Sequence, residues 1–247
     1  MIATRKMSPG TYTLLDIPTK EPRVCWSMNT WRTRLLLNYK GLNYKTEWVE
    51  YPDIEPRLKP HVPPNAEGRR YQLPAIQLPD GSYVMDSYKI ADVINEKHPE
   101  PKLPLNTPVQ LRFTPLLVNF MTQLRPLFVP LVAQRLLGQA SLPYFHATRE
   151  EDVGMSLEEY GKTHGPGAFD RAEPFARQIT ALLNETPSGP YFMGDTVSYT
   201  DIMWAGILLF YKRLGDEEYE EVLRRTGDAE AHIRFLDAMS PWTKRED

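Results

Sequence analysis

The stretch that most constrains the fold of this chain runs from residue 72 to residue 95. Two short apolar runs, residues 75–78 and 83–85, flank the sequence Pro-Asp-Gly-Ser at 79–82. Glycine adopts positive φ at little cost and aspartate hydrogen-bonds within turns, so Asp-Gly between two such runs is typical of a β-hairpin. We therefore predict two short antiparallel strands here.

Both ends of the predicted hairpin carry further signals. Pro74 stands just before the first strand, where a missing N–H is tolerated and where a cis peptide bond can form a tight turn. Asp86 and Ser87 follow the second strand, and both are good N-cap residues. Apolar residues at helical spacing come next, among them Ile90 and Ile94. The unit is therefore predicted to be strand, turn, strand and capped helix.

The residues before this unit predict a strand, a helix and a second strand. Residues 12–17 and 44–51 are β-like, and the segment between them becomes helical before it reaches Gly41, a natural helix stop. This spacing favours a βαβ unit with parallel strands and a right-handed crossover. Residues 52–71 are expected to form an irregular loop or a short helix. The resulting order is that of a thioredoxin-like domain.

A proline-dense segment, residues 98–108, separates this region from a part of the chain without strand signals. We therefore predict an α+β protein of two domains. The thioredoxin-like domain spans residues 1–100, a linker spans 101–108, and an all-helical domain spans 109–247.

Two patterns define the helical domain. Residues 109–138 are strongly apolar and helical in length, but three prolines are expected to kink or break them: Pro115, Pro126 and Pro130. Further on, Ser198 and Asp201 form a capping box. The helix that this box opens, residues 202–213, is apolar almost all round, so we expect it in the core.

Composition excludes several kinds of partner. The net charge of −3 and the absence of a basic stripe argue against nucleic acid. One cysteine, Cys25, excludes an internal disulfide and a cysteine-rich metal site, and the five histidines lack ligand spacing, so we expect no metal. The opening residues lack the apolar core of a signal peptide, and no run approaches a membrane-spanning length. We expect a cytoplasmic protein with no membrane partner.

The hairpin unit resembles the glutathione-binding half of the glutathione S-transferases. In that family a cis-proline precedes the third strand, and the residue before it pairs its backbone with glutathione. An acidic or amide residue followed by serine, at the cap of the next helix, binds the γ-glutamyl group. The resemblance implies glutathione as co-substrate and five binding residues: Gln72, Leu73, Pro74, Asp86 and Ser87.

The run Trp-Ser-Met-Asn-Thr-Trp at residues 26–31 is similar to the fungal etherase-related class of these enzymes, which usually has Ser-Pro-Asn-Thr-Trp. The serine of that motif is proposed to face the glutathione sulfur, so the resemblance implies a serine-type site at Ser27. Met28 replaces the proline of the motif, which leaves Ser27, Asn29 or a backbone amide as the sulfur's partner. Cys25 lies two residues before the position at which cysteine-type relatives carry their nucleophile, and we favour a buried role for it.

Elementary chemistry supports Ser27 at this point. The sulfur must be held as a thiolate, and a free cysteine thiol has a pKa of about 8.5 that nearby donors or a helix N-terminus lower. Ser27 follows the first strand and precedes the first helix, where free N–H groups favour negative charge. Taken alone, Ser27 is better explained as a helix cap. Beside the hairpin unit, the functional interpretation is favoured.

The second substrate is predicted to bind in an apolar pocket between the domains. Met121, Tyr144 and Leu208 could contribute, and the main candidates are Phe120, Arg125, Phe128, Trp204 and Tyr211, although aromatic residues at helical spacing are more often core. We predict a glutathione transferase that conjugates or transfers glutathione to hydrophobic, plausibly aromatic, electrophiles, and a homodimer, which is usual in the family. The alternatives are a ligandin-type protein that binds aromatic metabolites with little turnover, and a non-catalytic relative.

Overall fold

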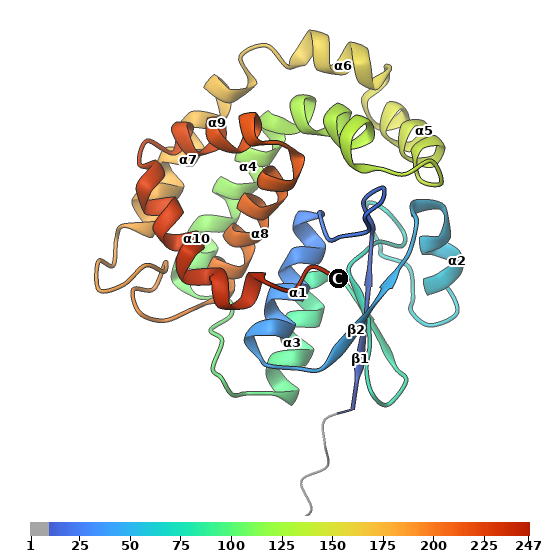
Figure 1. Ribbon diagram of the computed structural model, residues 1–247, viewed down its shortest axis with the longest axis horizontal. Helices are drawn as coiled ribbons and strands as arrows, with labels where there is room; N and C mark the ends of the chain where they lie inside the picture. Colours follow the sequence, from blue (N-terminus) through green and yellow to red (C-terminus); the bar gives the residue numbers. More distant parts are fainter. Residues whose placement is uncertain (1–9) are drawn as a thin grey trace, which may run out of the picture.

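The computed structural model describes residues 10–247, so the predictions that concern the first nine residues lie outside the described part (Figure 1). The N-terminal elements are β1 (Tyr12–Asp16), α1 (Met28–Tyr39), β2 (Tyr44–Trp48), the 3-10 helix η1 (Tyr51–Asp53), α2 (Ile54–Leu58), β3 (Ala75–Gln77), β4 (Tyr83–Met85) and α3 (Ser87–Lys97). The sheet order is β2-β1-β3-β4, with β1 parallel to β2 and antiparallel to β3. This is the predicted thioredoxin-like order.

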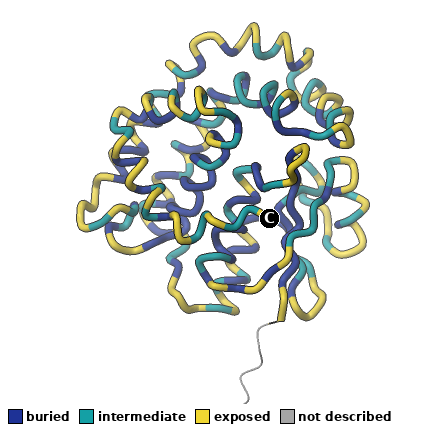
Figure 2. The backbone as a smooth tube through the Cα atoms, viewed as in Figure 1, coloured by how far each residue is buried: buried dark blue, intermediate teal, exposed yellow. Residues whose placement is uncertain are grey.

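Strand β1 lies at the centre of the sheet and is buried along its whole length (Figure 2). Successive side chains of a strand point to opposite faces. Leu14 accordingly packs into the larger core with α1 and α3, while Leu15 packs into a smaller core with Ile54 and Leu58 of α2. The sheet is therefore covered on both faces, and its upper end in Figure 1 meets the helical part.

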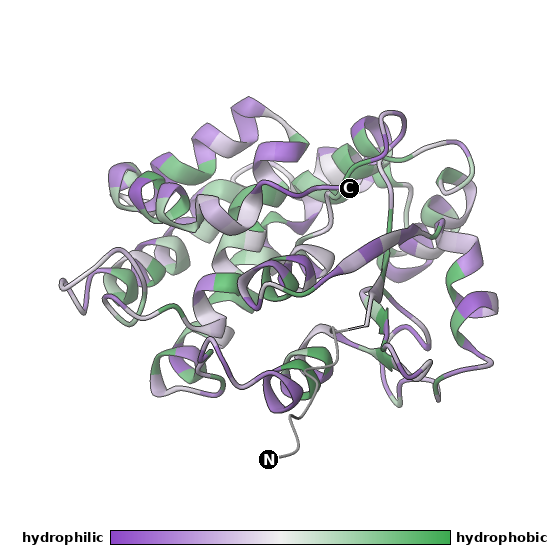
Figure 3. Ribbon diagram, turned by 60° about the horizontal axis from the view of Figure 1, so that its bottom comes forward, coloured by the Kyte–Doolittle hydropathy of each residue, from purple (hydrophilic) through white to green (hydrophobic). Residues whose placement is uncertain are grey.

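The helical part contains α4 (Pro108–Leu131), the π-helix η2 (Val132–Leu136), α5 (Leu142–Val153), α6 (Leu157–His164), α7 (Ala168–Leu183), α8 (Tyr199–Leu214), α9 (Asp216–Thr226) and α10 (Ala229–Thr243). Hydrophilic and hydrophobic residues alternate around most of these helices (Figure 3). Helix α8 is the exception because nearly all of its residues are buried. Its predicted capping box is confirmed: the Asp201 carboxylate accepts hydrogen bonds from the N–H and the hydroxyl of Ser198, both at 2.7 Å.

One part of the expectation for helix α4 is wrong: its prolines do not break it. It runs without a break through Pro115, Pro126 and Pro130. A proline keeps the helical φ and loses one hydrogen bond, so strong packing can hold the helix together. Helix α4 packs along α7, α6 and α8, and Gly161 of α6 lies so close to Pro126 and Pro130 that a Cβ there would stand 3.3–3.4 Å from them. The irregular winding appears only after the last proline, in η2.

The segment Pro108–Leu136 also corrects the expectation that no run reaches membrane-spanning length. By length and apolar composition alone, this helix would suffice to cross a membrane. In the structure, its buried residues include Phe113, Phe120 and Leu124, which form part of the main core. A core helix of this kind passes the same test.

A buried polar chain connects three helices of the helical part. The indole Nε1 of Trp204 donates to Nδ1 of His232 at 2.9 Å, and Nε2 of His232 lies 2.8 Å from the Thr180 hydroxyl. The Thr180 hydroxyl donates to backbone carbonyls, so the histidine is neutral and carries its proton on Nε2. Burial lowers the pKa of His232 to about 4.

This histidine is expected to make stability depend on pH. The unfolded histidine titrates near pH 6.5. Between about pH 6.5 and the lower pKa of the folded state, His232 is therefore protonated in the unfolded chain and neutral in the folded one. The contribution of His232 to the free energy of unfolding is fully present above about pH 6.5. It is lost as the pH falls toward 4, and the total loss is about 3 kcal/mol. Urea unfolding at several pH values checks this: His232→Gln should have a flatter profile than the wild type, and identical slopes would contradict the assignment.

Candidate active site

A two-lobed cavity lies where the loop after β1, the N-terminus of α1 and helix α5 meet. Each lobe has a volume of about 140 Å³. The first, called the polar lobe below, is bounded by Gln72 and Leu73 together with the loop residues Arg69 and Tyr71. The second, called the apolar lobe, is bounded by Trp26, Phe128, Val129, Val132, Phe145 and Phe210. Four residues line both lobes: Ser27, Asn29, Tyr51 and Arg149.

Ser27 occupies the N-cap position of α1, with φ −67° and ψ 129°. Its carbonyl accepts from the Trp31 N–H at 2.9 Å and from the Thr30 hydroxyl at 3.0 Å. Its own hydroxyl makes no capping hydrogen bond. The simple cap interpretation therefore does not account for this side chain. Ser27 and Asn29 of the first turn of α1 both line the cavity, and a helix start of this kind favours an anion.

The start of α1 is held in place by the core. Trp26 donates its indole N–H to the Pro18 carbonyl at 3.2 Å. Gly206 of α8 allows a close approach, because a Cβ there would lie 3.0 Å from the Met28 carbonyl oxygen. Cys25 is fully buried, with its sulfur 3.5 Å from the Thr30 hydroxyl, and burial raises the pKa of its thiol. It lines neither lobe, as expected of a structural cysteine.

The segment before β3 offers an unoccupied backbone edge. The Leu73–Pro74 bond is cis, as predicted. Neither the N–H nor the carbonyl of Leu73 has a hydrogen-bond partner among residues 10–247. The carbonyl of Pro74 accepts from the N–H of Asp86 at 3.2 Å, which ties this edge to the start of α3.

Asp86 and Ser87 lie at the N-terminus of α3 and line neither lobe. One oxygen of the Asp86 carboxylate caps α3 through the N–H groups of Tyr88 and Lys89, and the other lies 3.4 Å from the side-chain amide of Gln72. Gln72 therefore links this helix start to the polar lobe. Asp86 has φ +90°, a strained value for a residue other than glycine that often marks a functional site.

Helix α5 and the 3-10 helix η1 contribute residues that sequence reasoning missed. The ring of Tyr51 stacks on Tyr144 with centroids 6.1 Å apart and planes 11° apart. Ser141, before α5, accepts from the Tyr51 N–H at 3.0 Å and donates to Glu50 at 2.6 Å. Burial raises the pKa of the Tyr51 phenol, so it stays protonated. Among these residues only Tyr144 carried a sequence signal, as an aromatic residue between the domains.

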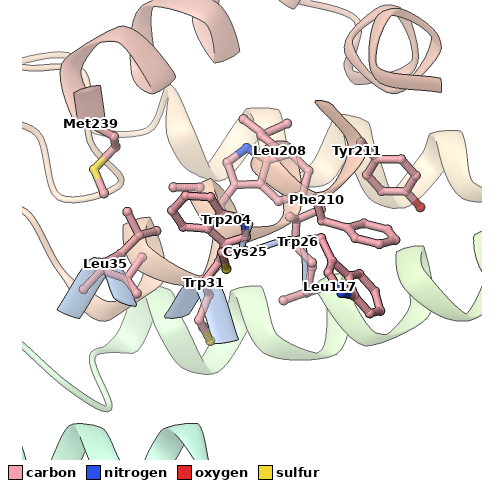
Figure 4. Close-up of a cluster of buried hydrophobic side chains, with 14 of the residues drawn as sticks. Cys25, Trp26, Trp31, Leu35, Leu117, Trp204, Leu208, Phe210, Tyr211 and Met239 are labelled. Atoms are coloured by element: carbon pink, nitrogen blue, oxygen red, sulfur yellow. The ribbon is translucent and has the colours of Figure 1, made fainter. Parts of the chain in front are cut away.

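The predicted hydrophobic-ligand residues separate into two groups. Phe128 lines the apolar lobe. Phe120, Trp204 and Tyr211 do not: they are at most 1% exposed, and Phe120 packs on both of the other two in the core. Figure 4 shows Trp204 and Tyr211 within this core. Their placement corrects the prediction, because Trp204 and Tyr211 stand on α8, nearly all of which is buried, and Phe120 of α4 packs against both of them. Arg125 lies outside both lobes, 3.4 Å from Asp152.

Within residues 10–247, no group of three or more His, Cys, Asp or Glu side chains lies close enough together to hold a metal ion. The polar groups that line the two lobes are hydroxyl, amide, phenol and guanidinium groups.

Comparison with known proteins agrees with this architecture. The family model of the glutathione S-transferase N-terminal domain matches residues 26–97, and that of the C-terminal domain matches residues 110–242. A glutathione S-transferase-like protein of Aspergillus flavus, ustS, is 30% identical over 80% of this chain and 78% of its own length.

Two solved structures are similar along nearly the whole chain. The glutathione transferase GSTFuA3 of Phanerochaete chrysosporium is 30% identical with a TM-score of 0.81, over 97% of this chain and 100% of that one. CsGST63524 of Ceriporiopsis subvermispora, solved in complex with glutathione, is 30% identical with a TM-score of 0.80, over 96% and 99% of the two chains. The chain therefore belongs to the glutathione S-transferase family, and both domains of that family are present in it.

Proposed function

We propose that this glutathione transferase holds its co-substrate along the polar lobe as a thiolate and transfers it to hydrophobic, aromatic electrophiles in the apolar lobe. One observation carries the proposal: the lobe beside Leu73 and the lobe walled by aromatic and aliphatic side chains share Ser27 at the start of α1. A sulfur at their junction would meet a hydroxyl donor and a helix N-terminus on one side and an apolar acceptor on the other.

The glutathione peptide is proposed to pair with the open backbone edge of Leu73. A γ-glutamyl group beyond it would reach the N-terminus of α3, where Ser87 and the helix amides suit its carboxylate and Asp86 suits its ammonium group. Gln72, which contacts Asp86, lies between the two.

Ser87→Ala is expected to weaken glutathione binding by roughly 10- to 100-fold, the effect of losing one charge-assisted hydrogen bond of about 1.5–3 kcal/mol. Titration calorimetry with glutathione measures this. Ser82→Ala is the control, because Ser82 lies in the exposed hairpin turn and its hydroxyl bonds only Asp80. An unchanged affinity of the Ser87 variant would contradict the placement of the γ-glutamyl end.

The reaction assigned to the site is nucleophilic attack by the thiolate. The sulfur forms a bond to an electrophilic carbon, and the leaving group departs with its electron pair. We propose the serine-type, etherase-related class, supported by the hydroxyl of Ser27, which makes no capping bond. Met28 stands where the class usually has proline, and Asn29 lines both lobes beside Ser27, so Asn29 is the alternative donor.

Conjugation of glutathione to chlorodinitrobenzene, followed by chromatography of the thioether, tests the function. We expect turnover well above the uncatalysed rate. A protein that binds a fluorescent aromatic probe, displaced by plant phenolics, but leaves the rate at background would be a ligandin. A protein that fails to bind glutathione would be a non-catalytic relative.

The proposal also includes a division into two domains at residues 101–108, a segment between α3 and α4 that contains no helix or strand. We further propose that the protein forms a homodimer. The exposed apolar side chains of Leu111 and Val118 on α4 offer contact surface for a second copy.

A further inference from the structure

Arg149 is the one charged residue that lines the apolar lobe in the part of the chain described by the structure. It stands on α5, and its guanidinium lies 4.9 Å from the ring centroid of Phe145 and 5.5 Å from that of Tyr51. Arginine stacks on aromatic faces and keeps its planar fork of donors free at the edge. The two rings therefore hold this cation in a fixed orientation at the junction of the lobes.

The charge of Arg149 has no carboxylate partner. Its Nη1 donates to the Thr148 hydroxyl at 3.0 Å, and the guanidinium also interacts with the Tyr51 phenol, but no carboxylate contacts it within residues 10–247. Two neighbouring arginines differ in this respect. Arg69 pairs with Asp152 at 2.7 Å and with the Thr148 carbonyl at 2.8 Å, and Arg125 reaches the same Asp152. A half-buried guanidinium beside an aromatic lobe is thus left with donors that a ligand can use.

We propose that Arg149 selects second substrates that carry an anionic group, namely aromatic carboxylates and phenolates. The proposal rests on the proposed function, since it assigns the apolar lobe to the acceptor. The aromatic ring of the acceptor would occupy the lobe walled by Phe128, Phe145 and Phe210, and its acidic group would face the guanidinium. A carboxylate matches the fork of arginine with two parallel hydrogen bonds.

The position of Arg149 favours the acceptor over glutathione as the source of the anion. Arg149 stacks on Phe145, which lines the apolar lobe and not the polar one. The polar lobe has its own cation, Arg69, on the loop that leads to Gln72 and Leu73. Arg69 is paired with Asp152, however, and Arg149 lines the polar lobe as well, so the KM for glutathione is the measurement that separates the two sources of the anion.

Binding of unreactive probes tests the proposal without any turnover. Dinitrobenzoate and the neutral dinitrobenzamide are titrated into the wild type, Arg149→Gln, Arg149→Lys and Arg112→Gln by calorimetry, with glutathione present. We expect Arg149→Gln to weaken the benzoate by roughly 10- to 100-fold and the benzamide by less than about twofold. Arg149→Lys should recover part of the loss, because lysine keeps the charge without the fork.

Arg112 stands on α4 and forms an exposed ion pair with Glu185, so Arg112→Gln removes the same charge far from the lobes and should change neither affinity. The preference is then measured as the ratio of kcat/KM for chlorodinitrobenzoate and chlorodinitrobenzamide, each converted to its thioether with loss of chloride. Arg149→Gln should lower this ratio by the same factor as the binding ratio, while the KM for glutathione stays constant.

Three results would overturn the inference. Equal losses for both probes would show that Arg149 only supports the lobe. A raised KM for glutathione with a constant acceptor ratio would assign Arg149 to the co-substrate. No measurable binding of either probe would show that the lobe holds no such ligand. Failure of the proposed function looks different: both probes bind with the expected preference, but no thioether forms.

Discussion

Ser27→Ala is expected to lower kcat for conjugation by roughly 100- to 1,000-fold. This is the loss expected when one preorganised hydrogen-bond donor to the negative charge of the thiolate is removed. Ser27 stands at the N-cap of α1 without a capping bond of its own, and it lines both lobes of the cavity. Its hydroxyl can therefore donate to a thiolate at their junction. Glutathione affinity should change little, because Leu73, Asp86 and Ser87 hold the peptide.

Asn29→Ala is the matched comparison for this prediction. Asn29 lies on the first turn of α1, is exposed, and lines the same two lobes. With Ser27 as the donor, Asn29→Ala keeps most of the activity. The reverse pattern, full activity in Ser27→Ala and a large loss in Asn29→Ala, would assign the sulfur to Asn29 and leave Ser27 as a helix start.

Arg34→Met is expected to cost about 3–5 kcal/mol of unfolding free energy, because it leaves the Asp16 carboxylate buried without its partner. Nη2 of Arg34 lies 2.9 Å from Asp16, and both side chains are 0% exposed. The same guanidinium reaches the Thr46 hydroxyl at 3.1 Å and the carbonyl of Asp247. It thus joins α1, the end of β1, β2 and the last residue of the chain at one buried point.

Urea unfolding measures this loss, with Arg57→Met as the control. Arg57 pairs with Glu47 at 2.6 Å, but the two side chains are 27% and 36% exposed, so their pair is worth about 0–1 kcal/mol. The double variant Asp16→Leu with Arg34→Met should recover much of the stability, since it leaves no lone charge in the core. A loss below about 1 kcal/mol in Arg34→Met would contradict the role of the pair.

The N-terminal fold was predictable because its signals are local. Gly81 has φ +88° in the hairpin turn, Asp86 caps α3, and Gly41 ends α1 with φ +63°, each as the residue type suggested. The capping box of Ser198 and Asp201 is equally local. In each case a few neighbouring residues fix the backbone, so the sequence alone contains the information.

The prolines of α4 could not be judged in the same way. Whether Pro126 and Pro130 break a helix depends on what packs against it, and that is Gly161 of α6, about thirty residues further on. The same applies to Phe120, Trp204 and Tyr211. Their spacing fits both a core face and a cavity wall, and only the position of α8 in the middle of the bundle decides for the core.

The walls of the cavity also required the structure. Tyr51 and Arg149 are almost a hundred residues apart and meet because Ser141 and Glu50 join α5 to η1. Neither residue belongs to a motif, so no local pattern identifies them. Sequence reasoning found the side of the site that the hairpin and the first helix build, and it missed the side that α5 contributes.

Titration of the glutathione thiol bound to the protein tests the central claim most directly. The ultraviolet absorbance of the thiolate is followed against pH in the wild type, Ser27→Ala and Asn29→Ala. We expect a midpoint below the value of about 8.5 for a free cysteine thiol in the wild type and in Asn29→Ala. In Ser27→Ala it should rise by about 2–3 units, which corresponds to the loss of one such donor. A midpoint in Ser27→Ala equal to that of the wild type would contradict the assignment of Ser27.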